Sequence, residues 1–203
     1  MSLYSRRVLP LLTHLGMSDR ALTAERARWI PRAAGVVLEI GVGSALNVPF
    51  YGSNVRKLYA LEPSEGLRRM AAPRASRAAF PVEFLAASAE AIPLPAASVE
   101  WVVTTWTLCT IGDPSMALRE IKRVLHPEGG VLFVEHGRSP DPRVLRWQDR
   151  LTPIWRRVAG GCHLNRPIDR MIEDAGFTIE RLERGYIRGP RFSTFLYRGI
   201  ARP

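Results

Sequence analysis

A carboxylate and two glycines stand together where a predicted buried strand gives way to a loop. Residues 35–40 are nearly all apolar, which is typical of a strand covered on both faces, and Glu39 interrupts the run. An unpaired carboxylate there would cost several kcal/mol, so Glu39 should have a partner such as backbone amides or a ligand's positive charge. Gly41 and Gly43 let the backbone turn and approach a ligand without a Cβ in the way. The stretch therefore predicts a site for a nucleotide-type ligand.

Two ligands compete for this loop, a dinucleotide and S-adenosylmethionine. A dinucleotide fingerprint places glycine or alanine at the last position of G-x-G-x-x-G, where helix and strand pack closely, and Leu46 stands there in this chain. The fingerprint also has no need of a carboxylate two residues before its first glycine, whereas a ligand that carries an ammonium group does. Glu39 therefore favours the amino acid end of S-adenosylmethionine.

A second carboxylate, Glu62, follows the next apolar run, residues 55–61, and stands 23 residues beyond Glu39. That is the offset expected of an acid that accepts hydrogen bonds from a ribose diol across a βαβ unit. Both candidate ligands contain adenosine, so Glu62 supports the nucleoside without choosing between them. A solvated acid or a helix cap is the alternative. Ser64 is expected to be the N-cap of a helix that breaks near Pro73.

Several motifs between residues 35 and 137 resemble those of the class I methyltransferases, in particular the small-molecule group that includes the ubiquinone and menaquinone C-methyltransferases. Residues 39–45 look like the first motif of that family, Glu62 like its ribose acid and residues 88–90 like its adenine-edge motif. The chain departs from the family at Ser88, where aspartate is frequent, and at Ala45, the third glycine position. Further matching residues are Asp113, Pro114, Glu120, Ile121, Arg123, Val124, Leu125, Pro127, Gly129 and Gly130.

The resemblance implies an α/β fold of the Rossmann-like class I methyltransferase type. Its sheet is expected to be mostly parallel and seven-stranded, with a C-terminal antiparallel hairpin and helices on both faces. The implied cofactor is S-adenosyl-L-methionine. The residues expected to bind it are Glu39, Gly41, Gly43, Asn47, Glu62, Pro63, Ser88, Ala89, Glu90 and Thr105.

Two segments follow the fourth and fifth predicted strands, where ligands collect in open sheets. Glu135 and His136 are the candidate catalytic residues, because an imidazole can take a proton near neutral pH when a carboxylate or backbone group orients it. A purely structural histidine is the alternative. The expected substrate pocket comprises Tyr4, Trp106, Thr107, Cys162 and His163. For the Cys162-His163 pair, a reactive thiol beside an imidazole and plain packing both stay open.

A narrower resemblance concerns the methyl acceptor. Residues 106–110, the Glu135-His136 pair, Trp147, Trp155 and residues 161–166 together resemble the membrane-associated alkyl thiol S-methyltransferases of animals and their bacterial relatives. The resemblance implies methyl transfer to a small, partly apolar acceptor, with a thiol first and a quinone-like ring carbon or a phospholipid amine behind it. A non-catalytic protein that binds S-adenosylmethionine is the alternative outside enzymes. Because the chain lacks the hydrophobic N-terminal anchor of that group, a soluble or peripherally bound protein is expected.

Length and composition fit a single methyltransferase domain of 203 residues. Residues 1–34 are expected to form an N-terminal helical cover, 35–138 the cofactor-binding core, and 139–203 the substrate-side helices and terminal hairpin. The two cysteines give neither a disulfide framework nor a zinc spacing, so no metal is expected. Arg6-Arg7 precede no signal-peptide cleavage site, and no apolar run approaches the roughly 18 residues of a spanning helix. A cytoplasmic location is expected.

The net charge of +10 lies in the two flanks of the chain. Residues 36–138 hold ten basic and ten acidic residues, whereas residues 1–35 hold six and two, and residues 139–203 hold thirteen and seven. An anionic substrate, an anionic membrane surface and nucleic acid would each suit basic flanks, as would a solvated arginine surface. No nucleic acid partner is expected, because the basic residues are scattered without interleaved aromatics. A small-molecule substrate and peripheral contact with an anionic membrane are the expected partners, and the oligomeric state is open.

The elements that must position these residues follow from the hydrophobic pattern. Helical segments at 3–15 and 18–30 should precede a sheet that begins near residue 35, and alternating strands and helices imply parallel pairing. Asp113 and Pro114 should begin a helix that Gly129-Gly130 closes, followed by a fifth strand at 131–134. Helices are expected at 143–158 and 167–175, and the terminal hairpin at 177–186 and 192–201.

Overall fold

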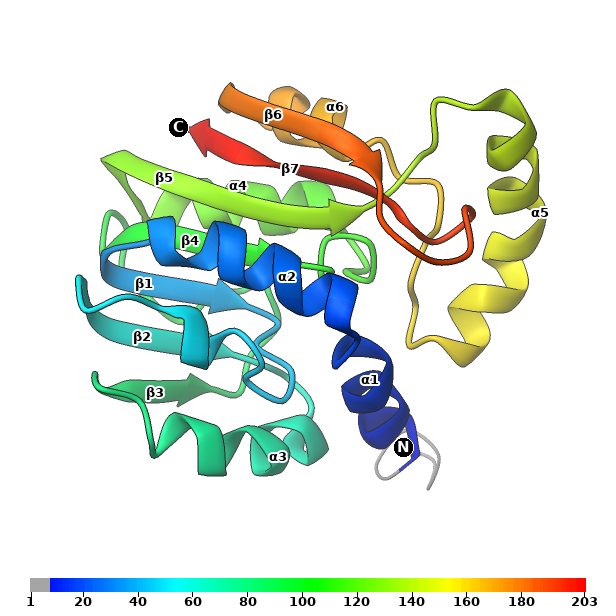
Figure 1. The fold of residues 1–203 in the computed structure, drawn as a ribbon. Coiled ribbons are helices and arrows are strands. Elements are labelled where there is room, and N and C mark those ends of the chain that lie inside the picture. The colour runs from blue at the N-terminus through cyan, green and yellow to red at the C-terminus, as the bar shows by residue number, and fades with distance from the viewer. Residues whose placement is uncertain (1–7) are drawn as a thin grey trace.

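The computed structural model describes residues 8–203, which build a seven-stranded sheet in the order β3-β2-β1-β4-β5-β7-β6 (Figure 1). Neighbours among the first five strands pair in parallel, and β7 runs antiparallel to both β5 and β6. The predicted mostly parallel sheet with a C-terminal antiparallel hairpin is confirmed. The strands are β1 (Gly35–Ile40), β2 (Val55–Leu61), β3 (Val82–Leu85), β4 (Val99–Thr105), β5 (Leu125–His136), β6 (Thr178–Tyr186) and β7 (Phe195–Arg202).

Helices cover both faces of the sheet, as the sequence predicts. In Figure 1, α2 crosses one face while α4 and α6 lie behind the other, and α1 and α5 lie beyond the ends toward which the parallel strands point. None of the helices in the described part of the chain is long and apolar enough to cross a bilayer. The helices are α1 (Leu9–Met17), α2 (Arg20–Trp29), α3 (Glu65–Ala75), α4 (Pro114–Val124), α5 (Pro142–Val158) and α6 (Ile168–Asp174), with short 3₁₀ turns η2 (Ile30–Arg32) and η3 (Val48–Phe50).

Two hydrophobic clusters sandwich the sheet, one on each face. Successive side chains of a strand point to opposite faces, so Leu38 and Ile40 of β1 join one cluster while Val37 joins the other. The four buried residues of α4 recur at helical spacing and pack into the first cluster: Ala117, Leu118, Ile121 and Val124. Burial on both faces fixes the register of the central strands, and with it the place where each strand releases its loop.

The predicted start of α4 is confirmed. The Asp113 side chain accepts a hydrogen bond from the Met116 amide at 2.9 Å, and Pro114 occupies the first turn. The predicted end is wrong, because α4 stops at Val124 and Gly129-Gly130 belong to β5. Glycine is needed there for close strand packing. A Cβ at Gly129 would lie 2.7 Å from a β4 carbonyl oxygen, and one at Gly130 would lie 2.9 Å from an aromatic ring.

The predicted break of the third helix near Pro73 is also wrong. Ser64 caps α3 by accepting a hydrogen bond from the Leu67 amide at 3.4 Å, as expected, but the helix continues through Pro73 to Ala75. A proline so close to the end removes a bond only from the final turn, so the helix tolerates it.

Candidate functional site

A cavity of about 450 Å³ opens at the carboxyl ends of β1, β2 and β4. Ligands collect at this edge of open parallel sheets because the loops that follow the strands meet there. Trp106 and Thr107, two of the residues predicted for the substrate pocket, line the cavity. So do all ten residues that the sequence assigns to the cofactor: Glu39, Gly41, Gly43, Asn47, Glu62, Pro63, Ser88, Ala89, Glu90 and Thr105.

Glu39 is almost fully buried and anchors one end of the cavity. Its Oε1 accepts a hydrogen bond from Asn47 Nδ2 at 2.9 Å, and its Oε2 accepts one from the Tyr51 hydroxyl at 2.7 Å. Arg26 Nε donates in turn to Asn47 Oδ1 at 3.0 Å. Burial raises the pKa of Glu39 to about 7, although the hydrogen bonds from Tyr51 and Asn47 oppose that rise. A cationic ligand group beside this carboxylate would favour its ionised form.

Glu62 joins the loop after β1 to the loop after β2. Its Oε2 accepts a hydrogen bond from the Gly43 amide at 3.0 Å, and its Oε1 accepts one from the Ser64 amide at 2.9 Å. Each carboxylate oxygen can accept a further hydrogen bond, which leaves acceptor capacity toward the cavity. Burial raises the pKa of Glu62. The helix-cap alternative holds in part, because Glu62 binds the amide of the cap residue Ser64.

The glycine-containing turn takes left-handed backbone conformations. Gly41 has φ +67°, and a Cβ added to it would lie 2.6 Å from the Thr107 side chain. A Cβ at Gly43 would instead meet only a backbone oxygen at 3.9 Å, so the space beside Gly43 is open. Ala45 takes φ +60° at the third motif position, a conformation that glycine adopts more readily. The turn thus presents backbone to the cavity.

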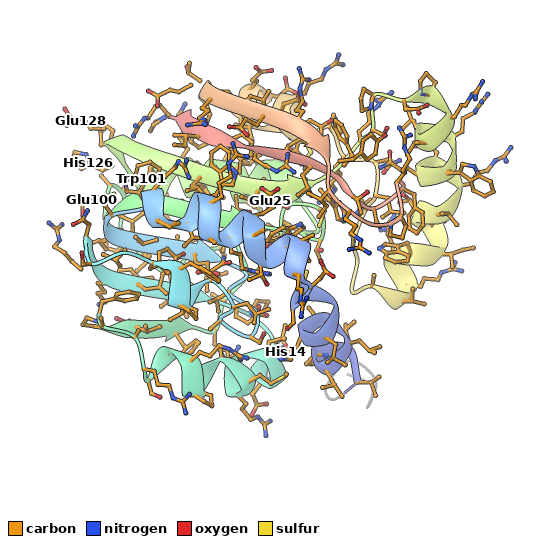
Figure 2. The ribbon with its side chains drawn as sticks, viewed as in Figure 1. His14, Glu25, Glu100, Trp101, His126 and Glu128 are labelled. Carbon is orange, nitrogen blue, oxygen red and sulfur yellow. The ribbon has the colours of Figure 1, made fainter. Side chains whose placement is uncertain are left out.

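Three further polar residues of the site were missed from the sequence: His14, Arg26 and Tyr51. His14 lies on α1, and its Nδ1 pairs with Ser44 Oγ at 2.8 Å, which ties α1 to the loop after β1 (Figure 2). The Arg26 guanidinium lies 4.8 Å from the centre of the Trp106 ring. Each stands alone in the sequence without a motif, so only the fold brings His14 and Arg26 to the cavity wall and Tyr51 to Glu39 behind it.

A separate buried cluster lies beside the cavity. It consists of Cys109, His136 and Cys162, whose donor atoms all lie within 4.8 Å of one another, with His136 Nε2 and Cys162 Sγ 3.0 Å apart. Thr110 is adjacent to this cluster and lines the cavity. The cluster residues themselves do not appear on the cavity wall formed by the described residues.

Two residues predicted for the substrate pocket therefore lie elsewhere. Cys162 directs its thiol toward His136, and His163 pairs with the Cys109 carbonyl oxygen through its amide at 2.8 Å and its ring at 3.3 Å. Neither residue lines the cavity formed by the described part of the chain. Tyr4, the remaining pocket prediction, lies outside the described residues.

Glu135 holds the loop after β4. Its Oε1 accepts hydrogen bonds from the Thr104 hydroxyl at 2.6 Å and from the amides of Thr107 at 3.0 Å and Leu108 at 3.1 Å. Burial raises its pKa to about 8, and negative charge on Cys109 adds to the rise. No hydrogen bond within residues 8–203 joins Glu135 to His136, since successive residues of a strand point apart.

The pKa values of the two thiols in the cluster shift in opposite directions. The hydrogen bond from Cys162 lowers the pKa of Cys109 well below its usual range, against the opposing effect of burial, and the charge of His136 lowers it further. The same hydrogen bond and burial raise the pKa of Cys162. Burial lowers the pKa of His136, but the charge of Cys109, its hydrogen bond and the charge of Glu135 together outweigh burial and raise the pKa to about 9. These shifts favour ionisation of Cys109 over that of Cys162, and the charged form of His136.

The sheet order, the antiparallel β7 and the glycine turn between two carboxylate-ended strands define a class I methyltransferase fold. Residues 38–133 match the sequence model of the family described as a methyltransferase domain. This segment of the chain is a domain of the S-adenosylmethionine-dependent methyltransferases.

Two curated relatives and one solved structure are similar to the chain. Thiol S-methyltransferase TMT1B of Rattus norvegicus is 33% identical over 151 residues, which cover 72% of this chain and 62% of the relative. Thiol S-methyltransferase TMT1A of Homo sapiens is 30% identical over 76% of this chain and 64% of the relative. The chain thus spans less than two thirds of their length. A Thermotoga maritima structure is described as a SAM-dependent methyltransferase and possible histamine N-methyltransferase. It matches with a TM-score of 0.68 at 19% identity, over 98% of this chain and 96% of that structure, and so shares the fold.

The cavity fits S-adenosylmethionine, the cofactor of this family. A buried carboxylate, Glu39, stands at one end, where a cationic amino group would complete its hydrogen bonding. Glu62 offers acceptors for a ribose diol, and the open space at Gly43 allows close approach to the backbone. The volume of about 450 Å³ lies in the range of small-molecule sites.

Proposed function

We propose that this protein transfers a methyl group from S-adenosylmethionine to the sulfur of a small, partly apolar thiol. The observation that carries the acceptor is the 30–33% identity to thiol S-methyltransferases over about three quarters of the chain. The cavity agrees with such an acceptor, because apolar residues also line it. These residues are Leu9, Pro10, Met17, Trp106 and Ile111.

Different residues on the cavity wall bind different parts of the cofactor. We assign the amino acid end to Glu39 and Asn47, and the ribose to Glu62. The adenine edge is assigned to residues 88–90, where Ser88 and Glu90 are joined by a side-chain hydrogen bond. When bound, S-adenosylmethionine supplies an electrophilic methyl group on a sulfonium. The chain's own contribution is to hold the acceptor about 3 Å from that methyl, in line for displacement, and to exclude water with α1.

Arg26 is placed to favour the reactive form of a thiol. A thiol ionises with a pKa of about 8.5 in solution, so a nearby positive charge raises the thiolate fraction at neutral pH. Arg26 lines the cavity and lies against Trp106, and burial lowers its pKa only to about 10, so the guanidinium stays charged. Because the thiol then loses its proton to solvent, no side chain on the cavity wall has to accept that proton.

The direct role of His136 as a proton acceptor stays a prediction that the geometry does not favour. Its ring belongs to the cluster with Cys109 and Cys162, and Nε2 pairs with Cys162 Sγ at 3.0 Å. Among the described residues, His136 also does not line the cavity where the methyl acceptor would bind. We therefore assign His136 to the cluster and leave acceptor activation to Arg26.

A competition among matched acceptors tests the proposal. The protein receives S-adenosylmethionine with a trideuterated methyl group and an equimolar mixture of hexanethiol, hexylamine, a phenol and a quinol, and products are identified by mass spectrometry. We expect the deuterated thioether to dominate. Dominant methylation of the amine, the phenol or a ring carbon contradicts a thiol acceptor and supports the phospholipid-amine or quinone-like alternatives. Cofactor binding with no methylated product favours the non-catalytic alternative.

A further inference from the structure

Three soft or borderline donors converge from separate segments beside the cavity. Cys109 lies in the turn after β4, His136 is the last residue of β5, and Cys162 lies in the loop between α5 and α6. All three are at least nine-tenths buried, and their Sγ and imidazole nitrogen atoms lie within 4.8 Å of one another. Two thiols and an imidazole facing one point inside a protein is an uncommon arrangement for packing alone, since each is a ligand for thiophilic metals.

Backbone contacts fix the segments that carry the two thiols. The His163 amide donates to the Cys109 carbonyl oxygen at 2.8 Å, and the Arg166 guanidinium donates to the Leu108 carbonyl oxygen. The Cys162 amide donates to the Ala159 carbonyl oxygen at 3.2 Å. On the other side, Glu135 holds the Leu108 amide at 3.1 Å. The donors therefore converge by the fold itself, which lowers the ordering cost of binding an ion there.

Polar groups of the cluster are poorly satisfied by protein partners. Within residues 8–203, buried His136 Nδ1 has no hydrogen-bond partner, and neither has Oε2 of the adjacent Glu135. The Cys109 thiol contacts the Trp106 carbonyl oxygen at 3.5 Å and Thr110 Oγ1 at 3.4 Å, besides its partners in the cluster. Buried polar groups normally have partners, and exceptions point to a ligand, an ion or a functional role.

We propose that Cys109, His136 and Cys162 together bind one thiophilic divalent cation, with Zn²⁺ as the best fit. Zinc binds thiolates at about 2.3 Å and imidazole nitrogen at about 2.0 Å, and two cysteines with one histidine form a known three-ligand set that leaves a fourth position open. A central ion would set its donors about 3.5–3.8 Å apart, within the observed spread of 4.8 Å. In the bound state both cysteines are thiolates and the imidazole is neutral, so the two dissociable protons of the metal-free cluster pass to solvent and the two thiolates balance the charge of the ion. Magnesium and calcium are disfavoured because they prefer oxygen ligands.

The spacing of these ligands explains why the sequence does not reveal the site. Zinc motifs are recognised by pairs of ligands a few residues apart, whereas His136 and Cys162 are 26 residues apart and each ligand comes from a different element. The proposal is independent of the methyl acceptor, because it concerns only what the three side chains bind.

Metal stoichiometry on the untagged full chain tests the site directly. The protein is stripped with a chelator under reducing conditions, returned to Zn²⁺, and weighed by native mass spectrometry. We expect one zinc ion per chain, with a mass gain equal to one zinc less two protons. Substitution with Co²⁺ should give thiolate-to-metal charge-transfer absorption in the near ultraviolet. Both readouts use the wild-type protein and require no activity.

Variants identify the ligands. Cys109→Ser and Cys162→Ser should each weaken zinc binding by more than about 100-fold, a larger loss than outer-shell changes cause. His126→Ala is the matched control, because His126 lies at the opposite end of the sheet (Figure 2) and should keep one equivalent of zinc. Circular dichroism checks that each variant is folded, and calorimetry with S-adenosylmethionine reports the cofactor site separately.

Two results would overturn the proposal. One is a reduced wild-type chain that keeps its metal-free mass in excess Zn²⁺ while both thiols react with Ellman's reagent. The other is a folded Cys109→Ser or Cys162→Ser variant that binds zinc as tightly as wild type, which would place the ion elsewhere. Loss of zinc with intact thiol methylation would leave the proposed function standing, and loss of methylation with intact zinc would leave the metal site standing.

Discussion

Glu39 is a carboxylate whose environment is unfavourable for charge until a cation arrives. Its oxygens are held by Asn47 and Tyr51, yet burial raises its pKa to about 7 from a usual value of about 4.5. The protein therefore holds a buried carboxylate with a raised pKa at the point where we expect the ammonium group of the cofactor. Such a site loses some folded-state stability in exchange for a preorganised binding contact.

The pH dependence of stability should report this residue. A raised folded-state pKa means that the contribution of Glu39 to stability is fully present below about pH 4.5 and is lost as pH rises through about 7. The shift corresponds to about 3 kcal/mol between those limits. Urea unfolding of the cofactor-free protein at pH 5 and pH 8 should show that Glu39→Gln loses about 3 kcal/mol less than wild type over this interval. Parallel pH profiles for the two proteins would mean that Glu39 is not the titrating group.

A substitution at Gly41 tests the role of the backbone turn in cofactor binding. A side chain at φ +67° costs about 1–2 kcal/mol, and a Cβ there would also lie 2.6 Å from Thr107, which lines the cavity. Gly41→Val should therefore weaken S-adenosylmethionine and S-adenosylhomocysteine by more than about tenfold in calorimetry. Gly52→Ala is the control, since its Cβ would meet only a carbonyl oxygen at 4.0 Å. Equal affinities for wild type and Gly41→Val would remove this turn from the cofactor site.

Helix α1 is the element that covers the cavity. It places Leu9, Pro10, Thr13, His14 and Met17 on the wall, while its other face is exposed. The side-chain bond from His14 to Ser44 at 2.8 Å fixes this helix to the glycine-containing loop. Arg26 also donates to the Met17 carbonyl oxygen of α1 at 2.8 Å. Few polar contacts of this kind make α1 a candidate for the segment that opens for ligand exchange.

Removing the hydrogen bond between His14 and Ser44 should make local opening of α1 more frequent. A hydrogen bond contributes about 1 kcal/mol, so His14→Ala should lower cofactor affinity by up to about tenfold and raise amide exchange across α1. Leu12→Ala is the matched control, because Leu12 is exposed on the same helix and does not line the cavity. Hydrogen–deuterium exchange with mass spectrometry reads out both variants. Unchanged exchange across α1 in His14→Ala would contradict a covering role for this bond.

The sequence predicts the elements better than their limits. Apolar runs mark β1 and β2, and a cap with proline marks the start of α4, because local pattern decides these features. The end of α4 is mispredicted, since Gly129 serves a close approach to β4 that no local signal encodes. The same holds for the site. Glu39 and Glu62 belong to a motif, whereas Arg26 and Cys109 reach the cavity and its neighbour cluster only through tertiary folding.

On the scale of the whole molecule, one end combines exposed apolar and basic side chains. Helices α1 and α5 lie at the end of the molecule where the cavity opens (Figure 1), and a Cβ at Gly160, just after α5, would lie 3.3 Å from Leu9 of α1. Trp147 and Ile154 of α5 are 59% and 63% exposed. The helix also carries five arginines against one aspartate. This pattern is typical of a surface that meets an anionic membrane.

Vesicle binding tests that surface. We expect the protein to float with vesicles that contain phosphatidylserine, and to bind less at high salt and on pure phosphatidylcholine. The double variant Trp147→Ala/Ile154→Ala should reduce binding by about tenfold or more, because it removes the apolar contact. Met116→Ala on α4 is the control, a comparably exposed apolar residue at 44% on another element. Equal binding to both kinds of vesicle, or none, would contradict an anionic membrane as partner.

Single-turnover chemistry tests the central claim, methyl transfer to sulfur, most directly. Protein in excess is mixed with S-adenosylmethionine carrying a trideuterated methyl group and with hexanethiol, and both products are quantified by mass spectrometry in wild type and Gly41→Val. We predict equal amounts of deuterated methyl hexyl sulfide and S-adenosylhomocysteine from wild type, and a strong deficit of both from the variant. S-adenosylhomocysteine formed without the thioether, or the same thioether yield from both proteins, would contradict transfer to a thiol at this cavity.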